Sequence, residues 1–196
     1  MDTLKQCVYN KLILKDYLEN IYGIHYPVEI IHIIIIFYFK INKLSFVTAN
    51  DSTILTTFDK IYVWGYNQSV QLGIGHNKNQ NTPQELNLPN VTEIICGDLH
   101  TIGITLGKVY VWGYNYYGQL GLGHNDNINT PQELNLPNVQ KIICGSYHTI
   151  AITKLGKVYI WGFNSHGQLG LGHTNNEYIP QELNLPNVKK FICGVF

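Results

Sequence analysis

The sequence contains no arginine. Its 13 basic residues are all lysines and balance 13 acidic residues, so the formal net charge of the 196-residue chain is zero. Charged residues make up 13% of the chain, about half of their usual share, and the lysines form no basic run. Arginine supplies most paired hydrogen bonds to phosphate and guanine, and nucleic-acid binding requires clustered positive charge. We therefore expect no nucleic-acid partner.

Cysteine is also scarce, with four residues at positions 7, 96, 144 and 193. The last three follow one another at intervals of 48 and 49 residues. This spacing indicates one small apolar side chain in each of three equivalent units rather than the members of disulfide pairs. It predicts an intracellular protein in a reducing compartment, with the cytoplasm as the expected location and the nucleus as the alternative.

A hydrophobic run long enough to cross a membrane is missing as well. The most apolar stretch, "IIHIIIIFYF" at 30–39, spans 10 residues, whereas a transmembrane helix needs about 20. Lysine and acidic side chains interrupt the apolar positions before it, so no signal peptide is expected. We interpret residues 30–39 as a buried helix or strand and expect no membrane partner.

What the sequence does contain is an internal repeat. Trp64, Trp112 and Trp161 follow one another at intervals of 48 and 49 residues, and a cysteine lies 32 residues after each. The segment "PQELNLPNV" is identical in all three copies. A repeat of this length indicates supersecondary units that bury their faces against one another. The copies read KIYVWGYNQSVQLGIGH at 60–76, KVYVWGYNYYGQLGLGH at 108–124 and KVYIWGFNSHGQLGLGH at 157–173.

Each unit is expected to form β-strands. In the second copy, "TEIICG" (92–97), "HTIGIT" (100–105) and "KVYVWG" (108–113) are short β-branched and aromatic runs separated by turns that contain glycine. "PQEL" is interpreted as a shorter fourth strand with proline at its first position, where a missing N–H matters least. About four strands in some 50 residues is typical of a propeller blade.

The fold class predicted is therefore mainly β, a partial β-propeller of about three four-stranded blades with a short N-terminal helical segment. The first copy departs from the others, because Thr48 stands in the place of Cys96 and Ser52 in that of His100. The repeats occupy residues 44–196. The blades cover about 44–91, 92–139 and 140–187, and 188–196 begins an incomplete fourth unit.

Residues 1–43 lie outside the repeat. Apolar residues recur with helical spacing through 4–23, Gly23 is a typical helix stop, and Pro27 suits the first turn of a second helix. We expect this segment to cover the open face of a blade. The stretch "YPVEIIHII" (26–34) also faintly resembles the opening of an F-box, which leaves a ubiquitin-ligase adaptor open as an alternative function.

The stretch "CGDLHTIGITLGKVYVWGYNYYGQLGLGHNDNINTPQEL" resembles the regulator-of-chromosome-condensation repeat, whose units run through CGxxHT, a WG pair and GQLGxG. The resemblance extends over roughly residues 44–196. Kelch blades normally show a double glycine, which this sequence lacks, and no tryptophan is followed by aspartate as in the other common propeller repeat.

The resemblance implies a ring of seven blades, which three units cannot close. An open arc, an assembly of several chains through open blade edges and a truncated or degenerate copy all remain as interpretations. The family includes a nucleotide-exchange factor for a small nuclear GTPase, ubiquitin-ligase components and protein-binding inhibitors. Exchange in that family depends on an inserted hairpin, and intervals of 48 and 49 residues leave no room for one.

Three patterns invite a chemical interpretation. "GQLGLG" (118–123) suggests a phosphate loop, but no helix pattern or GK[ST] follows, so its glycines are assigned to tight turns. Cys96 with His100 and Cys144 with His148 suggest a metal or thiol site, yet their repetition favours packing, with each histidine hydrogen-bonded within a turn. His76, His124 and His173 are expected in surface turns. No catalytic residue, metal or cofactor is therefore predicted.

The positions that vary beside invariant neighbours are the better candidates for function, because binding residues tend to lie on loops held by a rigid scaffold. After each WG the copies read "YNQSV", "YNYYG" and "FNSHG". A row of aromatic side chains there would suit a protein partner, and packing between blades is the alternative. The prediction is a non-catalytic protein-interaction scaffold, with a GTPase regulator as the main alternative. The candidate interaction residues are Tyr66, Tyr114, Tyr116, Tyr117, Phe163 and His166.

Overall fold

The computed structural model describes residues 45–57, 60–185, 188 and 193. Phe46–Phe196 form one compact unit. The helices expected within residues 1–43 and the F-box-like stretch lie outside the described residues, and so does the predicted boundary at 43/44, which stays a prediction. None of the described residues belongs to a helix of the length and hydrophobicity that a membrane span requires.

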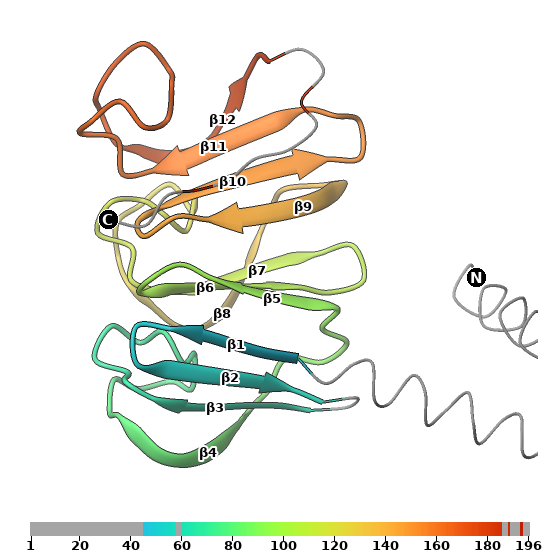
Figure 1. The fold of residues 1–196 in the computed structure, drawn as a ribbon, viewed down its shortest axis with the longest axis vertical. Helices are drawn as coiled ribbons and strands as arrows, with labels where there is room; N and C mark the ends of the chain where they lie inside the picture. The colour runs from blue at the N-terminus through green and yellow to red at the C-terminus, as the bar shows by residue number, and fades with distance from the viewer. Residues whose placement is uncertain (1–44, 58–59, 186–187, 189–192, 194–196) are drawn as a thin grey trace, which may run out of the picture. The chain divides into compact units, whose positions relative to one another are not determined.

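The described chain is mainly β, as predicted, and forms three four-stranded antiparallel sheets that follow one another along the unit (Figure 1). We call these sheets the first, second and third blade. In each blade, strands consecutive in the sequence are neighbours in the sheet. The first blade contains β1 (Ser45–Ala49), β2 (Ser52–Thr56), β3 (Ile61–Gly65) and β4 (Gln80–Leu86). The second contains β5 (Glu93–Cys96), β6 (His100–Ile104), β7 (Val109–Gly113) and β8 (Ile128–Leu134). The third contains β9 (Val139–Cys144), β10 (His148–Thr153), β11 (Val158–Gly162) and β12 (Glu177–Leu183).

The strand register repeats from blade to blade. The threonine of each HT pair lies opposite the tryptophan of the same blade, as Thr101 does opposite Trp112 and Thr149 opposite Trp161. The first blade keeps this register although its motif is altered, with Thr53 opposite Trp64. Equivalent residues therefore have equivalent cross-strand partners in all three blades, as the spacing of the repeat requires.

The fourth strand differs from the expectation. It was expected to be short and to begin at proline, but β4, β8 and β12 each span seven residues and carry the proline inside the strand. These strands lie at the outer edge of their sheets, so the position of Pro83 needs no N–H for a further neighbour. The pairing of β4 with β3 also shifts register between Val63 and Gly65, next to the proline-containing segment.

The hydrophobic cores lie between blades. One cluster joins Val63 and Leu72 of the first blade to Trp112 of the second. A second cluster joins Leu120 of the second blade to Trp161 of the third. The second blade therefore contributes one face to the core shared with the first blade and one to the core shared with the third, as in stacked repeat proteins.

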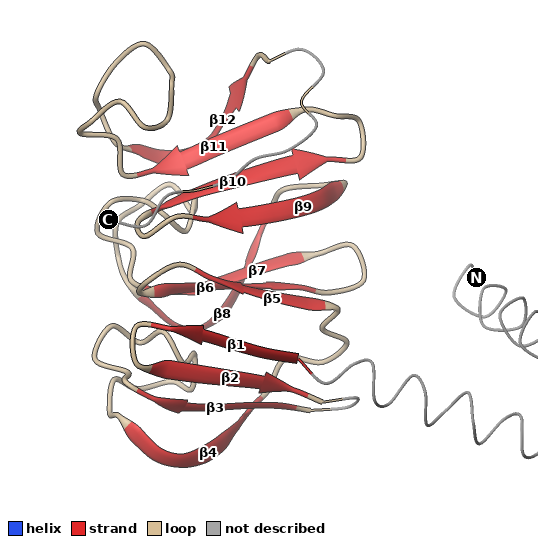
Figure 2. Cartoon of the chain, in the orientation of Figure 1, coloured by secondary structure: helices blue, strands red, loops and turns tan. Residues whose placement is uncertain are grey.

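The connections divide into two sets on opposite ends of the blades (Figure 2). The long loops that follow each WG pair and the short CGxx turns lie at one end, at the left of the view. The tight β6–β7 and β10–β11 turns lie at the other end. Because strands alternate in direction, this arrangement brings the variable positions after WG to a single end of the unit.

Candidate functional site

The QLG run forms the acceptor half of both described junctions between blades. The backbone carbonyl of Gln71 in the first blade accepts the indole N–H of Trp112 and the hydroxyl of Thr101, both at 2.9 Å. In the next junction, Gln119 accepts from Trp161 and Thr149 at the same distances. Both carbonyls thus receive two buried donors from the following blade.

The glycines of this run allow the indole to approach. Gly73 and Gly121 have φ of 72° and 73°, which favours glycine. A Cβ at these positions would lie only 2.6 Å and 2.8 Å from the indole nitrogens of Trp112 and Trp161. At Gly170 of the third blade, with φ of +67°, a Cβ would meet no described atom within 4 Å. The glycines serve the turn and the neighbouring blade.

The phosphate-loop alternative fails because the amide N–H groups of the run are already used. Gly121 donates to the carbonyl of Gly118 at 2.9 Å, and Gly123 donates across the junction to Tyr178 at 2.8 Å. The first blade repeats this arrangement, with Gly75 bonded to Asn129. An anion would find no converging set of free amides here.

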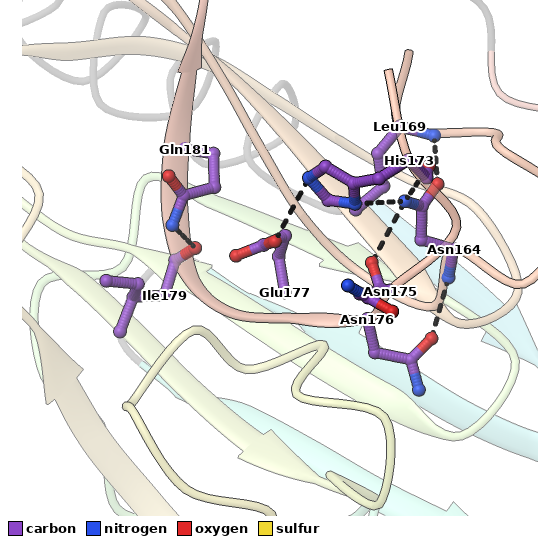
Figure 3. Close-up of polar contacts among 8 residues, drawn as sticks. All are labelled: Asn164, Leu169, His173, Asn175, Asn176, Glu177, Ile179 and Gln181. Carbon is purple, nitrogen blue, oxygen red and sulfur yellow. Dashed lines mark hydrogen bonds and ion pairs between the residues drawn. The ribbon is translucent and has the colours of Figure 1, made fainter. Parts of the chain in front are cut away.

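One buried asparagine organises each long loop, and sequence reasoning missed it. In the third blade (Figure 3) the Asn164 side chain accepts from the Leu169 N–H at 2.9 Å and donates to the carbonyls of His173 and Asn175 at 2.8 Å and 2.9 Å. Its own N–H donates to Asn176. Asn67 and Asn115 do the same in the other blades. The sequence did contain a signal for it, because an asparagine follows each WG pair after one intervening residue in all three copies.

His76, His124 and His173, which were expected in surface turns, lie in the later part of these long loops. In the second blade, His124 accepts the N–H of Asp126 on Nδ1 at 3.2 Å. His173 lies 3.5 Å from the Glu177 carboxylate (Figure 3). These contacts are local and belong to the loop structure.

The two CxxxH spacings do not form metal or nucleophile pairs in the described structure. Burial raises the pKa of Cys96 to about 12, although a weak hydrogen bond to Thr101 opposes the shift. Burial also lowers the pKa of His100 to about 3, with a smaller contribution from the charge of His148. Both groups are therefore neutral, the opposite of a thiolate–imidazolium pair. Among the described residues, no group of three or more His, Cys, Asp or Glu side chains is placed to hold a metal ion.

The expectation that His100 hydrogen-bonds within its own turn is wrong. Its Nε2 lies 3.2 Å from the hydroxyl of Thr149 in the next blade. Because Thr149 donates its own proton to Gln119, its oxygen can only accept from His100, which therefore carries its proton on Nε2. The histidine completes the junction, and the first blade, which has Ser52 at this position, lacks that contact.

The long loops bring aromatic rings of the second and third blades together at one end. Tyr114, Tyr116 and Tyr117 contact one another with centroids 5.2–6.3 Å apart. Tyr117 crosses the junction to Phe163 at 4.7 Å, and Phe163 contacts His166 at 5.9 Å. Five of the six candidate residues thus form one continuous cluster.

The cluster also contains Tyr147, which sequence reasoning missed. Its ring lies 5.4 Å from Tyr117 and 6.2 Å from Tyr114. The signal was the variable position in CGxxHT, where the third copy has "SY" and the second "DL". We call Tyr114, Tyr116, Tyr117, Tyr147, Phe163 and His166 the aromatic patch.

The sixth candidate, Tyr66, lies apart. Its hydroxyl donates to Gln68 of its own loop at 3.2 Å, and among the described residues no ring contact joins it to the aromatic patch. The first blade therefore contributes the same loop shape without extending the aromatic surface.

Tyr114 and Tyr147 of the patch are uncharged at neutral pH, because their pKa values are raised. Burial raises the pKa of Tyr114, and nearby Tyr117 and Tyr147 raise it further. Burial likewise raises the pKa of Tyr147, and the negative charge of Asp98 adds to the shift. Tyr116 is the most open of the tyrosines, with 59% of its surface exposed. The patch thus combines apolar rings, neutral hydroxyl groups and a carboxylate at its border.

A protein built from blades joined in this way is a β-propeller repeat protein. The Regulator of chromosome condensation (RCC1) repeat matches residues 59–104, 107–152 and 156–196, and a second model of that repeat matches 139–168. These matches cover more than half of the chain, which therefore belongs to the RCC1 repeat family. No curated protein sequence matches the chain.

The solved structures agree on the fold. Prp20p from Saccharomyces cerevisiae, a protein described with its binding to Gsp1p and histones, matches 74% of this chain at 22% identity and a TM-score of 0.66. Yeast RCC1 (Prp20) bound to Kap60 matches with the same values. The matched regions are 39% and 37% of those chains, so this chain spans about two fifths of their length.

Proposed function

We propose that the chain is a non-catalytic scaffold that binds another protein through the aromatic patch. The observation that carries this proposal is the continuous ring cluster across two blades, from Tyr116 to His166. Tyrosine is enriched in the cores of protein interfaces because it offers a large, rigid contact surface with a polar end. Loops fixed by buried asparagines order this surface before binding, which lowers the entropic cost of association.

The described cysteines are free thiols, and we place the protein inside the cell, in the cytoplasm or nucleus, where thiols stay reduced. The buried, neutral state of Cys96 and His100 supports a packing role for them rather than a catalytic one.

The scaffold proposal is tested by capturing partners from host lysate and repeating the capture with a double variant, Tyr116→Ser with Tyr147→Ser. We expect recovery of the specific partner to fall at least tenfold, since a few aromatic anchors carry most interface energy. The matched control is Leu106→Ser with Leu155→Ser. These leucines are 70% and 79% exposed in the turns at the opposite end of the blades. Partner loss in this control, with the patch variant unaffected, would move the interface to the opposite end.

Regulation of a small GTPase is the second candidate, because Prp20p is described with its binding to Gsp1p. At 22% identity that likeness concerns the fold alone. The loops at 66–79, 114–127 and 163–176 connect equivalent strands over equal lengths, so none of them carries an extra hairpin. Release of labelled GDP from candidate GTPases, unchanged by micromolar protein, would eliminate this candidate.

Self-association through open blade edges is a further interaction that we retain as a proposal. The third blade presents the carbonyl of Gln168 in register with Gln71 and Gln119, and no described residue donates a side-chain hydrogen bond to it. Trp64 of the first blade is only partly buried. Light scattering over a range of concentrations tests this proposal, and a constant mass would exclude it.

A further inference from the structure

Asp98 borders the aromatic patch. It lies in the CGxx turn of the second blade, between β5 and β6, and is partly buried. The next residue, Leu99, accepts the backbone N–H of Tyr114 at 2.9 Å. A Cβ added to Gly97 would lie 2.6 Å from the carbonyl of Gly145, so the turn also meets the turn that carries Tyr147. In keeping with this placement, the charge of Asp98 raises the pKa of Tyr147. Among the described residues, no lysine or histidine lies within ion-pair distance of this carboxylate. A partly dehydrated carboxylate without a cation is a site that a partner can neutralise.

The charges of the second and third blades are segregated between the two ends. The loops at the patch end contain Asp98 and Asp126 but no lysine. The lysines lie at the other end or on the strands, where Lys108 pairs with Glu133 at 2.7 Å and Lys157 with Glu182 at 2.9 Å. The patch end of these two blades is therefore negative, although the long loop of the first blade carries Lys78, and it attracts a positively charged segment.

The rings beside Asp98 suit a cation as well. The face of a tyrosine ring attracts ammonium and guanidinium groups, by about 0.5–2 kcal/mol according to their desolvation. In the described part of the chain, the hydroxyl groups of Tyr114, Tyr116, Tyr117 and Tyr147 make no hydrogen bond. Each can accept one from an N–H donor. Ring faces, hydroxyl oxygens and a carboxylate thus converge on one area of the surface.

We propose that the aromatic patch binds a protein segment carrying a lysine or arginine side chain, whose cation lies against the Tyr117 and Tyr147 rings beside Asp98. This inference rests on the proposed scaffold function and names the chemistry of its partner. An acidic segment would meet repulsion from Asp98. A proline-rich segment would use the rings but leave the carboxylate without a partner.

The test is a nuclear magnetic resonance titration of the full chain labelled in its tyrosine rings. The probes are four acetylated, amidated pentapeptides, Gly-Gly-X-Gly-Gly, in which X is lysine, arginine, norleucine or glutamate. We expect the lysine and arginine peptides to shift the resonances of Tyr117 and Tyr147 with millimolar affinity. The norleucine and glutamate peptides should bind at least fivefold more weakly. Equal binding of norleucine, or no shift with any peptide, would overturn the inference.

Asp98→Asn supplies the decisive variant, because it keeps the shape of the side chain and removes its charge. We expect it to weaken the lysine peptide about fivefold. Asp126→Asn is the matched control, since its carboxylate lies in the same set of loops and is 86% exposed. It should leave the affinity unchanged. Equal effects of the two variants would show general attraction to a negative surface and overturn the site beside Asp98.

The scaffold function can survive the failure of this inference. A lysate partner lost in the Tyr116→Ser/Tyr147→Ser variant but retained by Asp98→Asn would keep the interaction surface and remove the cation site. Partner binding unaffected by both variants would remove the proposed function itself.

Discussion

The indole N–H of Trp161 donates to the backbone carbonyl of Gln119 in the preceding blade at 2.9 Å. Trp112 makes the same bond to Gln71. Both tryptophans are fully buried, with no exposed surface, and the repeat thus uses an invariant side chain between units rather than within one. Trp64 has no described blade before it and makes no such bond among the described residues. We therefore expect the three equivalent tryptophans to contribute different amounts to the free energy of unfolding.

The first prediction concerns this bond. Trp161→Phe should lower the free energy of unfolding by about 2 kcal/mol, because it removes the N–H donor and part of a buried ring. Trp64→Phe, the matched control, should cost less than about 1 kcal/mol. Urea unfolding of both variants measures the difference, and equal losses would show that the junction bond contributes nothing.

The second prediction compares two glycines of similar conformation. Gly121→Ala and Gly170→Ala both place a side chain at positive φ, with values of 73° and 67°, which costs about 1–2 kcal/mol. Only Gly121→Ala also drives a methyl group against Trp161, at 2.8 Å from the indole nitrogen. It should be less stable than Gly170→Ala by about 1–3 kcal/mol. Thermal unfolding of the two variants measures this difference in stability. If Gly170→Ala is as unstable as Gly121→Ala or less stable, the proposed role of Gly121 in the junction is contradicted.

The third prediction concerns the loop asparagines. Asn115→Ala leaves the buried N–H of Leu120 and two loop carbonyls without partners, so it should destabilise the protein by about 2 kcal/mol or more. Exchange of the loop amides at 114–127 should also accelerate. Asn129→Ala, which removes a single exposed contact to Gly75, is the control. Unchanged amide exchange in Asn115→Ala would mean that the side chain does not hold the loop.

The fourth prediction concerns pH. Burial lowers the pKa of His100 to about 3, whereas the unfolded chain takes up this proton near pH 6.5. The unfolded state then binds more protons, so the contribution of His100 to stability is lost as the pH falls below about 6.5. His100→Gln removes this contribution, and its stability should fall less between pH 7 and pH 4.5 than that of the wild type. Parallel pH profiles, measured by urea unfolding, would contradict the neutral buried histidine.

Much of the fold follows from the sequence because a comparison of the three copies shows where each structural unit begins and ends. Three copies of one pattern fixed the strands to within a residue or two in β5, β6 and β7, and the resemblance supplied the blade. The fourth strand was misjudged because proline is a reliable signal against a central strand but a weak one at an edge, where only one neighbour needs hydrogen bonds.

The candidate site was less predictable. Tyr117 and Phe163 were identifiable as variable aromatic residues, but their contact depends on how one blade sits on the next. Tyr147 comes from a different loop, and no local pattern joins it to the others. The partner of His100 was missed for the same reason, because short spacings suggest contacts within a turn and Thr149 lies 49 residues away.

The junction has a direction. Each blade carries a QLG carbonyl on one side and an indole with a hydroxyl on the other, so both described junctions are made in the same way. A gene segment of one period that is copied in tandem would therefore encode a blade already matched to both of its neighbours. Such an array can grow by duplication without any new interface having to evolve, and near-identical copies are the record that this process leaves in a sequence.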